Sequence, residues 1–236
     1  MNQNGIFRRR LLPHWDVPDK PYFITACLEG SISSVGLKRI RQYRDELDAR
    51  PRPPKLSESE WELHKDKLVF ALVDNLLDNQ SPVRHLADER QAEVVQNAFL
   101  HFANGRYALL AYVVMPSHHH WLFLPNEQWS QVAVAGSLQA GGPRRTPREI
   151  ISHSIQSYTA TQCNRIREAT GCFWQNETFD HWVRDEGELH RIMTYIEHNP
   201  VVAGLVQRPE DYRWSSARLR KQLDIPLGQP LRNPVA

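Results

Sequence analysis

The sequence predicts an α+β fold: a ferredoxin-like split β-α-β antiparallel sheet with an added C-terminal helix. Three observations lead to this prediction. Short runs of aromatic and β-branched residues alternate with longer segments in which apolar residues recur at helical spacing. Two apolar runs are joined by only a proline and a serine, which indicates a hairpin. The resulting order, β-α-β-β-α-β-α, is that of the split β-α-β motif followed by one further helix.

The N-terminal half supplies the first strand and the first helix of this order. YFITACL at residues 22–28 is predicted to be a strand. The charged segment 31–87 is broken by PRPP and follows no single period, so we expect a peripheral insertion there with one or two helices. Residues 88–105 are predicted to form a helix that Asp88 caps and Asn104-Gly105 ends.

The second half supplies the central hairpin and two helices. YALLAYVVM at 107–115 is nearly continuously apolar and is predicted to be a central strand, and HHHWLFLP at 118–125 is predicted to be its antiparallel partner across a Pro116-Ser117 turn. A helix is predicted to start at Thr146, which forms a capping-box pattern with Glu149.

The C-terminal part supplies the last strand and the added helix. FDHWVRD at 179–185 alternates between apolar and polar residues and is predicted to be the fourth strand. Residues 185–200 are predicted to form the last helix, with a second capping-box pattern at Asp185 and Glu188 and an end at Pro200.

The composition is that of a globular protein with one core. The chain has 236 residues, 41% of them hydrophobic and 24% charged, so we expect a single domain over 1–221 and a tail at 222–236. No apolar run approaches the roughly 18 residues of a membrane span, and no apolar segment follows the N-terminal arginines. We therefore expect no membrane partner and no signal peptide. The three cysteines form no CxxC pair, which fits a reducing cytoplasm.

The net charge of +2 is too small to require a nucleic-acid partner by itself. The charges are unevenly distributed, however, with most acidic residues between 45 and 93. Clustered arginines could follow a phosphate backbone, although such clusters are more often solvated surface. The basic runs lie at residues 7–10, 141–149, 164–168 and 213–221.

The three consecutive histidines at the start of the strand 118–125 are the first candidate site. Side chains alternate along a strand, so His118 and His120 share one face, about 7 Å apart along the strand, and His119 lies on the other. Two imidazoles on one face can share a divalent cation. The pattern alone is a weak signal, because a strand can also simply begin with polar residues.

Tyr195 and Asn199 on the last predicted helix could complete this site. They are four residues apart, so they lie one above the other, at the border of the apolar stripe that faces the sheet. A phenol and a carboxamide there could meet the two histidines. Each residue also has an ordinary explanation: Tyr195 could be a core aromatic residue, and Asn199 could be a polar residue at a helix end.

Taken together, four motifs resemble the single-tyrosine HUH transposases, and in particular the REP-associated tyrosine transposases. The resemblance covers roughly residues 16–30 and 88–220 and leaves out the insertion and the tail. The block from Phe173 to Ala217 is its most specific part. The motifs are YVVMPSHHHWLF, HSIQSYTATQCNR, FWQNETFDHWVRDEGELHRIMTYIEHNPVVAGLV and PEDYRWSSA.

The resemblance implies a role for each candidate residue. His118 and His120 match the metal-binding pair, Tyr195 the nucleophile and Asn199 a third, oxygen-bearing metal ligand. Tyr158 is the alternative nucleophile. Two positions depart from the family's pattern. His119 stands where the family has a bulky apolar residue, and would be tolerated if its face of the sheet is only partly buried. Gln156 stands where relatives often carry a lysine.

The implied chemistry is metal-assisted transesterification of DNA. A divalent ion, magnesium or manganese by the ligand types, would polarise the scissile phosphate, although zinc would also bind. Attack by Tyr195 then gives a phosphotyrosine, which conserves the bond for later joining. The resemblance implies attachment to the 5′ phosphate with loss of a 3′ hydroxyl.

The implied partner is single-stranded or hairpin DNA inside a bacterial cell, at the nucleoid, and the chain could form a homodimer. Arginines would follow the backbone and aromatic rings would stack on bases. Ordinary surface or core packing is the alternative explanation for each candidate. The candidate DNA-binding residues are Arg144, Arg145, Arg148, Trp174 and Arg184.

Two other functions remain compatible with the sequence. A domesticated relative could bind DNA structures without transposing them. A metal-dependent phosphoesterase could act on a small substrate, and it would turn over without a covalent intermediate.

Overall fold

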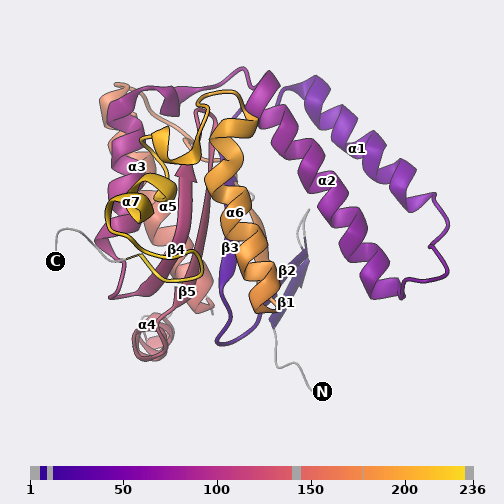
Figure 1. Ribbon diagram of the computed structural model, residues 1–236, viewed down its shortest axis with the longest axis horizontal. Helices are drawn as coiled ribbons and strands as arrows, with labels where there is room; N and C mark the ends of the chain where they lie inside the picture. The colour runs from indigo at the N-terminus through magenta and orange to yellow at the C-terminus, as the bar shows by residue number, and fades with distance from the viewer. Residues whose placement is uncertain (1–5, 10–12, 140–144, 177, 232–236) are drawn as a thin grey trace.

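The computed structural model describes residues 6–9, 13–139, 145–176 and 178–231, and it has a mixed α/β fold (Figure 1). Its strands are β1 (Ile6–Arg9), β2 (Pro13–Asp16), β3 (Tyr22–Cys27), β4 (Tyr107–Val114), β5 (His118–Pro125) and β6 (Phe179–Trp182). Its α-helices are α1 (Ser34–Asp48), α2 (Glu58–Gln80), α3 (Glu89–His101), α4 (Glu127–Gln139), α5 (Pro147–Ile166), α6 (Glu186–Val202) and α7 (Ser216–Gln222). Short 3-10 helices lie at His85–Ala87 and Pro209–Asp211.

The central sheet confirms the predicted fold class. Its four strands are antiparallel throughout and have the order β4-β5-β3-β6, which is the strand order of a ferredoxin-like sheet. The pairing of β3 with β5 places Thr25 opposite His120 and Cys27 opposite His118. The predicted succession β-α-β-β-α-β-α corresponds to β3, α3, β4, β5, α5, β6 and α6. The strands β1 and β2 form a separate two-stranded sheet that was not predicted.

Helices cover both faces of the central sheet, so two apolar layers form. Helices α3 and α5 pack together on one face, where Phe99, Trp121 and Ile151 are fully buried. Helix α6 covers the other face, where Met193 and Ile196 pack with Leu122. Figure 1 shows α3 and α5 on one side of the strands and α6 on the other.

The insertion forms two helices, as expected, but it is only in part peripheral. Figure 1 shows α1 and α2 running side by side as a hairpin beyond α6. A complete capping box of Ser57 and Glu60 starts α2. The second half of α2 packs on the α6 face of the sheet, because Phe70 contacts Phe23 and the Ser117 hydroxyl donates to the Leu77 carbonyl over 2.9 Å. This half of α2 therefore belongs to the core.

Three element ends differ from the sequence prediction. Helix α6 continues through Pro200 to Val202, because Pro200 lies in the last turn, where the ring removes a single backbone hydrogen bond. Strand β6 ends at Trp182, three residues earlier than predicted. Residues that follow α7 pack against the sheet instead of forming a free tail: Leu231 is buried, and its amide donates to the Leu109 carbonyl over 2.7 Å.

None of the helices in the described part of the chain is both long enough and apolar enough to span a bilayer. This agrees with the absence of a long apolar run in the sequence.

Candidate functional site

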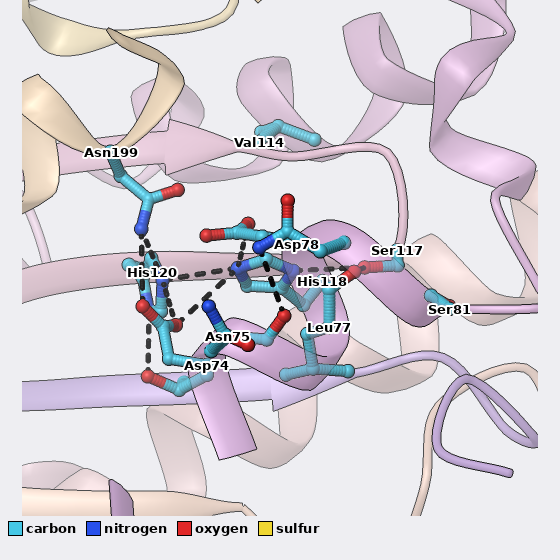
Figure 2. A network of polar contacts seen from close by, with 12 residues as sticks. Asp74, Asn75, Leu77, Asp78, Ser81, Val114, Ser117, His118, His120 and Asn199 are labelled. Carbon is cyan, nitrogen blue, oxygen red and sulfur yellow. Dashed lines mark hydrogen bonds and ion pairs between the residues drawn. The ribbon is translucent and has the colours of Figure 1, made fainter. Parts of the chain in front are cut away.

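The imidazoles of His118 and His120 lie side by side at the start of β5. Both side chains are completely buried, and their Nε2 atoms are 3.1 Å apart (Figure 2). Hydroxyl groups hold the other ring nitrogens: Thr25 Oγ1 lies 2.7 Å from His120 Nδ1, and Ser117 Oγ lies 3.0 Å from His118 Nδ1. Each ring is therefore fixed through Nδ1 and presents Nε2 to the same point, as paired metal ligands do.

His119 lies on the opposite face, as strand alternation predicts. Its ring packs edge-on against Phe99 and Trp174, with centroids 5.1 and 4.9 Å away. The condition under which His119 would be tolerated, a face that is only partly buried, is not met, because the side chain is 1% exposed and neither ring nitrogen has a hydrogen-bond partner. Burial, with smaller contributions from His120 and His118, holds the pKa of His119 well below the ordinary histidine value, so this ring is neutral.

Helix α6 brings Tyr195 and Asn199 to the histidine pair. The Tyr195 hydroxyl and the Asn199 Nδ2 each lie 3.5 Å from His120 Nε2. The helical spacing of four residues and the apolar contacts of Met193 and Ile196 with the sheet fix this orientation. All four residues predicted from the sequence for the catalytic centre are thus adjacent.

Helix α2 adds a carboxylate that the sequence analysis missed. Asp74 Oδ1 lies 3.1 Å from His120 Nε2 and 3.8 Å from His118 Nε2. Its Oδ2 accepts a hydrogen bond of 2.5 Å from the Tyr195 hydroxyl and one of 3.4 Å from Asn199 Nδ2. Figure 2 shows Asp74 on its helix beside the two imidazoles, with Asp78 one turn further along.

Four groups in this centre have shifted pKa values. Burial opposes ionisation of Asp74, but the imidazoles of His120 and His118 and the Tyr195 hydroxyl outweigh it and hold the pKa of Asp74 at about 2. Burial, then the Asp74 charge, raises the pKa of Tyr195 far above the usual 10 and that of Asp78 to about 7. Burial, then His120, lowers the pKa of His118 to about 3, so its imidazole is neutral, as a metal ligand must be.

The donor set fits a divalent cation. Asp74, His118 and His120 each offer one ligand atom, and these atoms lie within 4.8 Å of one another. Asn199 Oδ1 is buried and has no hydrogen-bond partner, and rotation of the amide by half a turn would exchange it with Nδ2 beside His120. Imidazole nitrogens combined with carboxylate and amide oxygens suit magnesium, manganese or zinc.

Tyr158 is excluded as the partner of this histidine pair within one chain. It lies on α5, half-exposed, and α5 packs on the face of the sheet opposite to His118 and His120. The sheet separates the two, so Tyr195 is the tyrosine that adjoins the pair.

The candidate DNA-binding residues have different surroundings. Arg148 is buried and forms an ion pair of 2.5 Å with Asp180, and Trp174 is buried with its Nε1 donating to Thr159 Oγ1 over 2.9 Å. These contacts give both residues a packing role, and a DNA contact by either one stays a prediction. Arg184 is exposed and Arg145 is partly exposed. Arg144 lies outside the described residues.

The sequence does contain a signal for Asp74. The segment LVFALVDNLLDN (68–79) is apolar except for Asp74, Asp78 and two asparagines, and the two carboxylates are four residues apart on one helix face. An acidic residue on the apolar stripe of a helix is rarely buried without a partner. The histidine pair on β5 is that partner.

Comparisons with known proteins find two similar proteins of one kind. No family model matches the chain. A protein of Haemophilus influenzae assigned as a REP-associated tyrosine transposase is 26% identical over 111 residues, which are 47% of this chain and 58% of that protein. The match therefore spans less than two thirds of the relative. A solved REP-associated tyrosine transposase bound to a REP hairpin aligns with 96% of this chain and 92% of its own, at 15% identity and a TM-score of 0.49.

Proposed function

We propose that the chain is a REP-associated tyrosine transposase that nicks and rejoins single-stranded or hairpin DNA through Tyr195 in a metal-dependent reaction. One observation carries the proposal: the Tyr195 hydroxyl and Asn199 Nδ2 both lie 3.5 Å from Nε2 of His120, which is one of two adjacent buried histidines. A nucleophile, two imidazoles and an amide oxygen ligand are the groups that phosphodiester transesterification needs.

The residues of the centre have separate tasks in this reaction. His118, His120 and Asn199 would hold a magnesium or manganese ion, which neutralises charge on the scissile phosphate when bound. The Tyr195 oxygen attacks phosphorus, the bond from phosphorus to the 3′ oxygen breaks, and the phenol loses its proton as the 3′ hydroxyl gains one. The DNA is then linked to Tyr195 through its 5′ phosphate. Attack by a 3′ hydroxyl on this linkage reverses the steps and rejoins a strand.

The proposed substrate is folded DNA with an unpaired segment. The solved family member with its REP hairpin supports this class of ligand for that protein. In this chain, Arg184 and Arg145 are the candidates for contacts to the phosphate backbone, because Arg184 is exposed and Arg145 is partly exposed. A substrate of this kind places the protein at the bacterial nucleoid.

A covalent-adduct assay tests the proposal. The protein is incubated with manganese and a labelled DNA hairpin that carries unpaired flanks, and the products are separated on a denaturing gel. We expect a protein-linked DNA band that Tyr195→Phe abolishes. Tyr158→Phe is the matched control and should keep the band, since Tyr158 lies across the sheet. A band that survives Tyr195→Phe would show that another residue is the nucleophile.

Burial of the centre favours one alternative, a DNA-structure-binding protein that does not cut. His118 and His120 are 0% exposed and Asn199 is 2% exposed, so bound DNA does not touch these groups unless α2 moves. Under this alternative, hairpin binding is retained in the double variant His118→Ala, His120→Ala, and wild type forms no adduct. Turnover of a small phosphodiester without an adduct would instead indicate a phosphoesterase.

A further inference from the structure

We infer that Asp74, on the inserted helix α2, is a ligand to the ion of this centre, so that ion binding fastens α2 onto the sheet. The inference rests on the metal site of the proposed function. It adds a carboxylate from outside the region that resembles the family, and it gives the insertion a defined role.

The lone pairs of three side-chain atoms converge on one point in the centre. His118 Nδ1 and His120 Nδ1 are engaged by hydroxyl groups, which leaves both Nε2 atoms directed at each other over 3.1 Å. Asp74 Oδ1 joins them at 3.1 and 3.8 Å and has no hydrogen-bond donor of its own. Three electron-rich atoms at these separations repel one another in a dry site unless a proton or a cation lies between them, and a cation engages all three at once.

The separations between the ligand atoms are those expected around one divalent ion. Ligand atoms about 2.1 Å from one divalent ion lie about 3 Å apart when adjacent, as the two Nε2 atoms and the nearer Asp74 contact do. Asp78 does not satisfy this condition. Its Oδ1 lies 3.8 Å from His118, and it is not part of the group whose ligand atoms all lie within 4.8 Å.

The ligand residues lie on three separate elements of the fold. The imidazoles come from β5, the carboxamide of Asn199 from α6 and the carboxylate of Asp74 from α2. Outside the centre, Phe70 of α2 packs on Phe23 and Phe179, and the Ser117 hydroxyl donates to the Leu77 carbonyl. An ion shared by the three elements binds only when α2 is docked, so it stabilises the docked position by mass action.

Manganese binding measured by calorimetry in the full chain tests the assignment. We expect Asp74→Ala to raise the Kd for manganese at least about tenfold, and Asp78→Ala, one turn along the same helix, to leave it within about twofold. Both variants should give a cooperative thermal unfolding transition in EDTA, which shows that they are folded. If Asp74→Ala does not fold, Asp74→Asn keeps the side-chain shape and should still weaken binding. Wild-type affinity in a folded Asp74 variant, or no manganese binding by wild type, would overturn the inference.

Amide exchange gives a readout of α2 itself. Manganese should slow exchange across residues 69–80 in wild type and in Asp78→Ala, and not in Asp74→Ala. Equal slowing in Asp74→Ala would contradict the inference.

The two proposals fail separately. If wild type forms no DNA adduct but manganese binding depends on Asp74, the nicking reaction is wrong and the ligand assignment stands. If Tyr195 forms the adduct and Asp74→Ala binds manganese like wild type, only the ligand assignment is wrong.

Discussion

The Tyr195 hydroxyl donates a hydrogen bond of 2.5 Å to Asp74 Oδ2, although 121 residues separate the two in the sequence. The bond joins the candidate nucleophile on α6 to the inserted helix α2. It also raises the pKa of Tyr195, after the larger effect of burial, so the phenol is protonated in this arrangement. A scissile phosphate that reaches Tyr195 must therefore replace Asp74 as the partner of this hydroxyl.

Phe70→Ala should loosen α2 from the sheet. The Phe70 ring lies 4.3 Å from the Phe179 ring and 6.0 Å from the Tyr195 ring, centroid to centroid, so its loss removes an apolar contact of α2 with the sheet and with Tyr195. Since Phe70 is only partly buried, we expect the free energy of unfolding to fall by about 2 kcal/mol, less than for a fully buried phenylalanine. Urea unfolding measures this change, and amide exchange in residues 69–80 should speed up in parallel. A stability loss with unchanged exchange in α2 would argue against Phe70 as its anchor.

His119→Leu should stabilise the protein and leave metal binding unchanged. The ring lies between Phe99 and Trp174 with both nitrogens unpartnered, and a buried polar group without a partner costs about 1–3 kcal/mol. Leucine has a similar volume and no polar atom, so we expect the free energy of unfolding to rise by about 1 kcal/mol. Calorimetry with manganese should give the wild-type Kd, whereas His118→Leu should abolish binding. Loss of manganese affinity in His119→Leu would show that all three histidines act together.

The fold was predictable because its signals are local. The capping box of Thr146 and Glu149 forms as its spacing indicates, with both reciprocal hydrogen bonds present. Asp185 also caps its helix, since its side chain accepts from the Glu188 amide. The Glu188 carboxylate instead contacts the Arg184 amide and the His181 imidazole, which compete for it with the backbone amide of Asp185. Tertiary contacts thus decide the detail that the local pattern leaves open.

The sequence predicts only those features of the site that follow from the period of a strand or of a helix. Alternation along β5 separates His118 and His120 from His119, and helical spacing pairs Tyr195 with Asn199. The position of Asp74 depends on how α2 lies across β5, which no period in the sequence specifies. The sequence signal for Asp74 was an acidic residue within an otherwise apolar helical segment, and the structure shows that this residue is buried.

Arg148 and Arg184 should respond differently to substitution. Arg148→Met leaves the Asp180 carboxylate buried without its ion-pair partner, so we expect a loss of about 3–5 kcal/mol in the free energy of unfolding. Arg184→Ala changes an exposed side chain, so stability should stay within about 0.5 kcal/mol of wild type. Its hairpin affinity should fall, and the slope of log K against log salt should decrease by about 0.7 for one lost single-strand phosphate contact. An unchanged slope would remove Arg184 from the DNA interface.

Glu188→Gln should destabilise the protein in a way that depends on pH. The Glu188 side chain is 7% exposed, accepts from the Arg184 amide over 3.0 Å, and lies 3.1 Å from His181 Nε2 and 3.8 Å from Lys67 Nζ. Burial opposes its ionisation, but His181, the Arg184 amide and the nearby positive charges outweigh burial and lower the pKa of Glu188 from 4.5 to about 2. A carboxylate whose pKa is lower in the folded state stabilises the fold above its unfolded value, and this contribution disappears as the pH falls through the folded value.

The stability difference between wild type and Glu188→Gln should therefore be largest above pH 4.5, at about 2 kcal/mol, because a hydrogen-bonded charge is lost. It should shrink as the pH falls from 4.5 toward 2, where the wild-type carboxyl is protonated as well. Urea unfolding of both proteins at pH 7, 4.5 and 3 measures this trend. Glu186→Gln, exposed on the same helical turn, is the matched control and should stay within about 0.5 kcal/mol of wild type. A difference for Glu188→Gln that is as large at pH 3 as at pH 7 would mean that the shape of the side chain, and not its charge, stabilises the start of α6.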